Sequence, residues 1–151
     1  MITYCPLPDF VESAAVMDRR RLRDQRLDTL QVARCLAGVP SSWRRHPTVA
    51  MWRGFPRALL RYQEANVARW QQIGNSDKSS GDRSVLLQTR DLLADFDETG
   101  DPPWLGDKVF HRSHQSNLVR MMPEHYSRYF PEVSTRWHFV WPPDMTALES
   151  A

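Results

Sequence analysis

The segment HRSHQSNLVRMMPEHYSRYFPE, residues 111–132, concentrates side chains that could take part in chemistry. Two of its histidines, His111 and His114, are three residues apart and therefore share one face of a helix. Zinc needs three or four protein ligands, but no cysteine or carboxylate joins the histidines at ligand spacing, and the H-E-x-x-H motif is absent. The pattern therefore predicts no metal site and favours histidines that are satisfied by hydrogen bonds or face a phosphate.

A second candidate group lies in the arginine-rich segment that begins at residue 18. Asp24 and Asp28 are one helical turn apart and are flanked by Arg20, Arg23 and Arg26. These charges could simply form ion pairs along the helix, which is the interpretation that the spacing alone favours. Alternatively, a carboxylate in an arginine-lined groove beside a DNA backbone could act as a general acid or base on the sugar.

The distribution of charge points to a polyanionic partner. Residues 18–70 contain twelve arginines, no lysine and four acidic residues, a balance of +8, whereas residues 75–110 carry a balance of −4. Arginine binds phosphate through two parallel hydrogen bonds, and a dense arginine field attracts polyanions. We therefore favour a nucleic-acid-binding surface over a basic helix face that is merely solvated.

Other classes of protein find no support in the sequence. There is no G-x-S-x-G, P-loop or dinucleotide-binding glycine pattern, so neither a serine hydrolase nor a nucleotide cofactor is expected. Cys5 and Cys35 do not form a C-x-x-C pair, and no secretory signal or membrane-spanning apolar run is present. We expect a cytoplasmic protein with reduced thiols, no cofactor and no membrane contact.

The elements that must position these residues are predicted to be helices. Asp9 followed by Glu12 predicts a helix start, and Gly38 and Pro40 end a long helix. The expected helices cover residues 18–37, 47–73 with an interruption at Gly54 and Pro56, 84–96, and 108 onward with a restart at Pro123. The sequence predicts a single all-α domain spanning 1–151, with a flexible loop at about 74–83 and a Pro- and Trp-rich tail at about 131–151.

Three pieces of the chain resemble a known family in the same order. They are RRRLRDQRLDTLQVARCLAG, RRHPTVAMWRGF and PPWLGDKVFHRSHQSNLVRMMPEHYSRYFPE. Together they are similar to the bacteriophage endonuclease V family of pyrimidine-dimer DNA glycosylases, and closest to its uncharacterised bacterial relatives. The resemblance runs from the N-terminus to about Pro131 and implies an all-α enzyme that acts as a monomer on damaged or modified pyrimidines in duplex DNA.

The resemblance also implies covalent chemistry without a cofactor. In that family the N-terminal α-amine attacks C1′ of the damaged nucleotide and forms an imine, and a glutamate on the basic helix assists β-elimination. Here Asp28 aligns with that glutamate, and Arg26 lies near the family's arginine. The phage enzyme exposes a threonine after losing its initiator methionine, but the bulky Ile2 generally prevents such removal. The amine is therefore expected at Met1, or at Ile2 if other processing exposes it.

The remaining site residues are expected to contact the DNA backbone. They come from the basic helix, from the residue before Pro47, and from a polar face of the histidine-containing helix: Arg19, Arg20, Arg21, Arg23, Arg26, His46, His111, Arg112, His114, Gln115 and Asn117. Tyr126, Tyr129 and Phe130 are expected to pack the helix end rather than stack on a base. For Trp43, Trp52 and Trp104, packing and base stacking both remain open.

Two alternatives remain at the level of function. The chain could be a DNA-binding protein on the same fold without lyase chemistry, which would bind DNA in a salt-sensitive manner and leave strands intact. It could also be a module whose basic helix binds a nucleotide or a protein.

Overall fold

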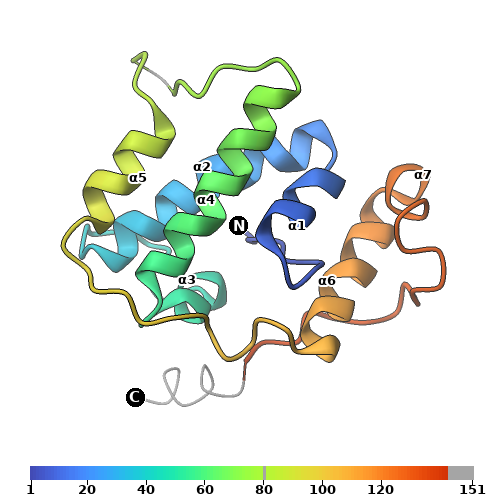
Figure 1. Ribbon diagram of the computed structural model, residues 1–151. Helices are drawn as coiled ribbons and strands as arrows, with labels where there is room; N and C mark the ends of the chain where they lie inside the picture. Colours follow the sequence, from blue (N-terminus) through green and yellow to red (C-terminus); the bar gives the residue numbers. More distant parts are fainter. Residues whose placement is uncertain (80, 143–151) are drawn as a thin grey trace.

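The computed structural model describes residues 1–79 and 81–142, and within them every regular element is a helix (Figure 1). The helices are α1 (Phe10–Val16), α2 (Arg19–Leu36), α3 (Pro47–Trp52), α4 (Pro56–Gln72), α5 (Val85–Leu93), α6 (Lys108–Met121) and α7 (Pro123–Tyr126). A single isolated bridge, between Lys78 and Ser84, is the only β pairing in these residues. The prediction of an all-α fold is confirmed.

The helices begin where the sequence predicts. Asp9 accepts a hydrogen bond from the backbone N–H of Glu12 at 2.9 Å and so caps α1. Asp18 caps α2 in the same way through the N–H of Arg21, at 3.3 Å. Pro47 occupies the first turn of α3, where its missing N–H costs nothing.

One helix is shorter than expected. α5 ends at Leu93 rather than at about residue 96. Ala94, Asp95 and Phe96 are exposed, so no packing holds a further turn, and Phe96 N–H bonds to Leu93 C=O at 3.2 Å in a tighter turn.

α2 is the central helix of a group that also contains α3, α4 and α5. It packs against α4 and α5, and its buried Leu22, Thr29, Val32 and Ala33 form an apolar stripe along one side of the helix. Figure 1 shows α6 and α7 together at one side of the molecule, reached by the long connection that follows α5. α7 packs on α6, and none of the described helices is both long and apolar enough to cross a bilayer.

The structure describes most of the two segments that were predicted as a loop and a tail, and both predictions stay predictions. The segment at 74–83 contains Asp77, which is buried and bonds to Arg26 of α2, and its flexibility stays a prediction. In the tail, the N–H groups of Trp137 and Val140 donate to serine hydroxyls of α6, at 3.2 and 3.1 Å. Residues 143–151 of the predicted tail lie outside the described residues.

Candidate active site

Residues 1–6 form no helix, and the N-terminus lies near the centre of the view in Figure 1. A cavity of about 260 Å³ lies between this segment and one face of α2. Its walls are formed by Met1, Ile2, Tyr4, Arg20, Arg21, Asp24, Gln25, Asp28 and Met121. The structure therefore brings together all three predicted catalytic residues, Met1, Ile2 and Asp28, with two of the predicted DNA-binding arginines.

Gln25 of α2 binds the N-terminal segment as a neighbouring strand would. Its side-chain oxygen accepts from Tyr4 N–H at 2.6 Å, and its side-chain nitrogen donates to Ile2 C=O at 2.6 Å. The hydroxyl of Tyr62, from α4, contacts the same Gln25 oxygen and lies 2.8 Å from Tyr4 C=O. Gln25 and Tyr62 are both almost fully buried, so water does not compete for these bonds.

Side chains of α3 bind Met1 and Thr3. The hydroxyl of Thr48 donates to Met1 C=O at 3.1 Å, and the indole N–H of Trp52 donates to the Thr3 hydroxyl at 2.9 Å. Thr3, Thr48 and Trp52 are fully buried. The amine of Met1 is thus attached to a backbone that is held at its first carbonyl.

α6 holds the other end of the segment through residues that the sequence assigned to a DNA-facing surface. His114 Nδ1 accepts from Cys5 N–H at 3.0 Å, and His111 Nδ1 lies 2.7 Å from Cys5 C=O. Gln115 donates to Pro6 C=O at 2.8 Å. His114 has no exposed surface and His111 is 4% exposed. Their expected role in phosphate contact is therefore wrong, because both side chains are enclosed.

Burial also fixes the charge of these two rings. It lowers the pKa of His114 to about 3, with a smaller effect from His111, and it lowers the pKa of His111 below its usual value. His111 Nε2 accepts from Gly106 N–H at 2.8 Å, so its Nδ1 must carry the proton that is donated to Cys5 C=O. Both histidines are neutral at pH 7 and serve as hydrogen-bonding partners of the N-terminal segment.

The polar groups of residues 1–6 are therefore bound one after another by four helices. Side chains of α2, α3, α4 and α6 reach Met1, Ile2, Thr3, Tyr4, Cys5 and Pro6. The first residues of most domains are poorly ordered unless they are tied down in this way. The result is an α-amine with a defined position at the wall of the cavity.

Two titratable side chains lie within electrostatic reach of that amine. Burial raises the pKa of the Asp28 carboxyl; the positive amine lowers it in part, and Asp24 raises it further. Burial lowers the pKa of His46, and the charge of the amine lowers it again. His46 Nδ1 accepts from Thr48 N–H at 3.1 Å, so His46 caps α3 beside the residue that binds Met1. The charge of the amine thus affects both Asp28, which lines the cavity, and His46, which does not.

The predicted DNA-binding arginines of α2 separate into four positions, the last of which is that of Arg26. Arg20 and Arg21 line the cavity, and Arg21 also pairs with Asp18 at 3.4 Å. Arg23 is exposed and pairs with Asp24 at 3.2 Å. Arg19 is exposed, donates to Asn75 at 2.8 Å and stacks on Trp70.

Arg26 is a correction to the sequence analysis. Its side chain is 4% exposed, pairs with Asp77 at 3.3 Å and lies over the Trp70 ring. Asp77 in turn accepts from the hydroxyl of Ser84 and the N–H of Leu86. Arg26 therefore attaches the 74–84 connection to α2 and is not available to contact a DNA phosphate.

Other polar residues of α6, and His125 of α7, contact nearby residues of the protein. Asn117 is buried and donates to Ser113 C=O at 2.8 Å, so it does not present a DNA-facing amide as expected. Arg112 is exposed and lies over the Trp137 ring. His125 bonds to Val16 C=O at 2.8 Å. Within the described residues, no three His, Cys, Asp or Glu side chains are grouped as they would be around a metal ion.

The aromatic residues that the sequence left open have separate positions. Trp52 and Trp104 are buried in the core, whereas Trp43 is 41% exposed. Packing of Tyr126 and Phe130 is confirmed, because both are buried. Tyr129, expected to pack with them, is 46% exposed.

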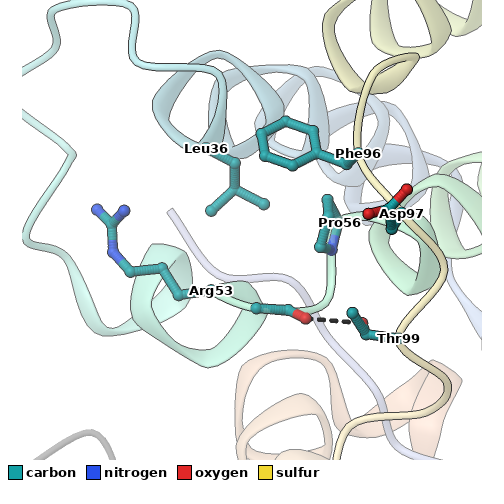
Figure 2. Close-up of a pocket in the computed structure, with 7 residues that line it drawn as sticks. Leu36, Arg53, Pro56, Phe96, Asp97 and Thr99 are labelled. Carbon is teal, nitrogen blue, oxygen red and sulfur yellow. Dashed lines mark hydrogen bonds between the residues drawn. The ribbon is translucent and has the colours of Figure 1, made fainter.

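A larger cavity, of about 400 Å³, lies at the C-terminal end of α2 and is shown in Figure 2. Its walls include Leu36, Arg53, Pro56 and Phe96, and Thr99 donates to Gly54 C=O at 2.7 Å beside it. It contains none of the residues that the sequence assigned to catalysis or DNA binding. Chemistry, rather than size, therefore selects the cavity at the N-terminus as the candidate active site.

The helical fold thus places the N-terminal residue, Asp28 and two arginines around one cavity. The family model described as pyrimidine dimer DNA glycosylase matches residues 1–80, more than half of the chain, and the chain belongs to this family. No curated protein and no solved structure matches the chain. The match covers every wall of the cavity except Met121 and ends before α5, so the resemblance of residues 102–132 stays a prediction.

Proposed function

We propose that this protein is a DNA glycosylase with abasic-site lyase activity on damaged or modified pyrimidines in duplex DNA. Its nucleophile is the α-amine of Met1, and Asp28 is its acid–base group. The observation that carries the proposal is the cavity in which a fixed amine meets a half-buried carboxylate and two arginines. A DNA substrate is what the family membership implies.

The first step replaces the bond between base and sugar by a bond between amine and sugar. The uncharged amine of Met1 attacks C1′, the N-glycosidic bond breaks, and the base leaves with the bonding electrons and takes up a proton. Loss of the amine's proton and opening of the sugar ring give a protonated imine between Met1 and C1′. Asp28 lies close enough to interact electrostatically with the amine and would stabilise the cationic imine.

The second step breaks the strand. A base removes a proton from C2′, the electrons form a C2′–C3′ double bond, and the C3′–O bond breaks with loss of the 3′ phosphate. Asp28 suits this role because burial raises its pKa and makes its carboxylate a stronger base than an exposed aspartate. Arg20 and Arg21 line the same cavity and would bind the phosphates on either side of the reacting sugar. Hydrolysis of the imine then releases the enzyme.

Borohydride trapping tests this proposal directly, because the reagent reduces an imine to a permanent cross-link. The full chain is incubated with three duplexes, one containing an abasic site, one a thymine dimer and one undamaged, and peptide mapping identifies the attached residue. A cross-link through Met1 on the dimer duplex is the expected result. A cross-link on abasic DNA alone would retain the lyase and reject the dimer as the substrate.

Asp24 offers a matched control for Asp28, since both are on the same wall of the cavity one turn apart. Asp28→Asn is expected to slow trapping by about 10²–10⁴-fold, the usual contribution of a general acid–base group, while Asp24→Asn stays within a few fold. Equal effects of the two substitutions would contradict the assigned role. Binding to all three duplexes without any cross-link would leave a DNA-binding protein without lyase chemistry.

A further inference from the structure

The exposed indole of Trp43 distinguishes it from the other tryptophans. All six lie in described residues: Trp52, Trp70 and Trp104 are buried, and Trp137 and Trp141 are half-buried. Among the six, Trp43 alone is exposed, with 41% of its surface accessible to solvent. A single exposed apolar side chain is common on protein surfaces, so the groups around Trp43 decide whether it binds a partner.

The backbone around Trp43 is fixed by hydrogen bonds. Its N–H donates to the Ser41 hydroxyl at 3.1 Å, and its C=O accepts from His46 N–H at 2.8 Å. Arg53, at the end of α3, donates to Arg44 C=O at 2.8 Å and ties the turn to the helix. The indole therefore projects from a supported turn rather than from a free loop.

The charge around this turn fits a nucleic-acid backbone. Arg44, Arg45 and Arg53 are exposed, and none of them forms an ion pair with an acidic side chain in residues 1–79 and 81–142. Three guanidinium groups without an acidic partner, beside an exposed aromatic ring, form a combination that binds unstacked bases. The charges bind the phosphates and the ring stacks on a base.

The turn is linked to the candidate nucleophile through two residues, His46 and Thr48. The Trp43 and His46 rings meet edge to face with their centroids 5.4 Å apart. His46 Nδ1 accepts from Thr48 N–H, and the Thr48 hydroxyl donates to Met1 C=O. Tyr129 is also exposed beside an arginine, but its ring is already stacked on Arg128 and it follows α7, which lies at the upper right of Figure 1, away from α3.

We propose that Trp43 stacks on an unpaired base next to the reacting nucleotide, while Arg44, Arg45 and Arg53 bind the phosphates of that stretch of strand. This inference rests on the proposed function for the position of the reacting nucleotide. It assigns to the 41–46 turn the recognition of distorted DNA, because only a base that has left the helical stack exposes a face to the indole.

Binding to two duplexes tests the assignment without requiring catalysis. One contains a tetrahydrofuran abasic analogue, which cannot form an imine, with 2-aminopurine as the neighbouring base; the other is intact. Trp43→Ala is expected to weaken binding to the analogue duplex about tenfold, to leave binding to the intact duplex within about twofold, and to abolish the change in 2-aminopurine fluorescence. Trp43→Phe should retain most of the discrimination, and Tyr129→Ala should retain all of it.

Trapping of the wild-type protein on a reactive abasic duplex, run in parallel, separates the two proposals. Loss of discrimination in Trp43→Ala without any wild-type cross-link would support stacking and reject the imine chemistry. A wild-type cross-link with unchanged discrimination in Trp43→Ala would overturn the stacking proposal and leave the chemistry standing. Equal weakening on both duplexes would also overturn it, because a residue that senses distortion must discriminate.

Discussion

Replacement of Gln25 by leucine should separate the stability of the fold from the position of the amine. Gln25 is 1% exposed and its side chain contacts Ile2 C=O, Tyr4 N–H and the Tyr62 hydroxyl. Leucine has a similar volume but cannot form these bonds, so two backbone groups of the N-terminal segment lose their α2 partner. We expect a loss of roughly 3 kcal/mol in the free energy of unfolding, at about 1 kcal/mol for each bond.

The chain is long enough for that loss to be tolerated and measured. A change of 3 kcal/mol in a domain of this size corresponds to a decrease of roughly 6–12 °C in Tm. If the amine then moves by about an ångström relative to Asp28, the rate of imine formation should fall by about a hundredfold. The rate is measured by single-turnover borohydride trapping on an abasic duplex, at a temperature where the variant is fully folded.

Gln63 of α4 provides the control. It is fully buried and donates to Arg26 C=O at 2.8 Å and to the Thr89 hydroxyl at 3.2 Å, but it does not touch residues 1–6. Gln63→Leu should therefore lower Tm by a comparable amount and leave the trapping rate within a few fold. If both variants trap at the wild-type rate, or both lose it equally, the anchoring of the N-terminal segment does not position the amine and the reasoning fails.

Three further predictions concern charge and capping. The pKa of His114 is about 3 in the folded protein and its ordinary value is 6.5, so the unfolded chain binds more protons than the folded one below pH 6.5. The free energy of unfolding should therefore fall by up to about 2 kcal/mol between pH 6.5 and 5. In His114→Asn the urea-denaturation midpoint should fall less over the same pH range. Since burial raises the pKa of Asp28, the rate of strand cleavage from the preformed imine should fall at acidic pH with a midpoint above 3.8, and this fall should be absent in Asp28→Asn; a fall that persists in that variant would belong to another group. Tyr126→Phe removes the hydroxyl that accepts from Asp18 N–H at 3.0 Å, so it should cost roughly 1–3 kcal/mol in thermal denaturation, whereas the exposed Tyr129→Phe should cost almost nothing.

The helices were predictable because their signals are local. Capping by Asp9, the prolines at 47, 56 and 123, and the apolar stripe of α2 each act within a few residues along the chain. The charges of α2 were visible for the same reason, and the family resemblance added the meeting of Met1 with Asp28. The position of each arginine side chain could not be predicted. Arg20 and Arg26 look equivalent in the sequence, yet Arg20 lines the cavity and Arg26 is buried against Asp77, 51 residues away along the chain.

The residues that hold the N-terminal segment were missed, although one of them left a signal. Gln25 lies three residues after Leu22 and four before Thr29, so it falls within the apolar stripe of α2. A polar side chain in a buried stripe must find a hydrogen-bond partner, and a buried non-helical segment is a natural source of unpaired backbone groups. The identity of that partner could not be read from spacing, because Tyr4 and Gln25 are 21 positions apart and a complete helix lies between them.

The histidines of α6 show why composition misled the expectation for that helix. A run of polar residues on one face normally faces solvent, but an extended segment that lies between helices presents peptide groups that cannot bond to one another. Those groups need polar side chains from the interior, and His111, His114 and Gln115 supply them. Polar side chains on a helix face therefore predict a solvent-facing surface only where no non-helical segment packs against that face. In the function that we propose, the same contacts also position the amine of Met1 at the cavity that Asp28 lines.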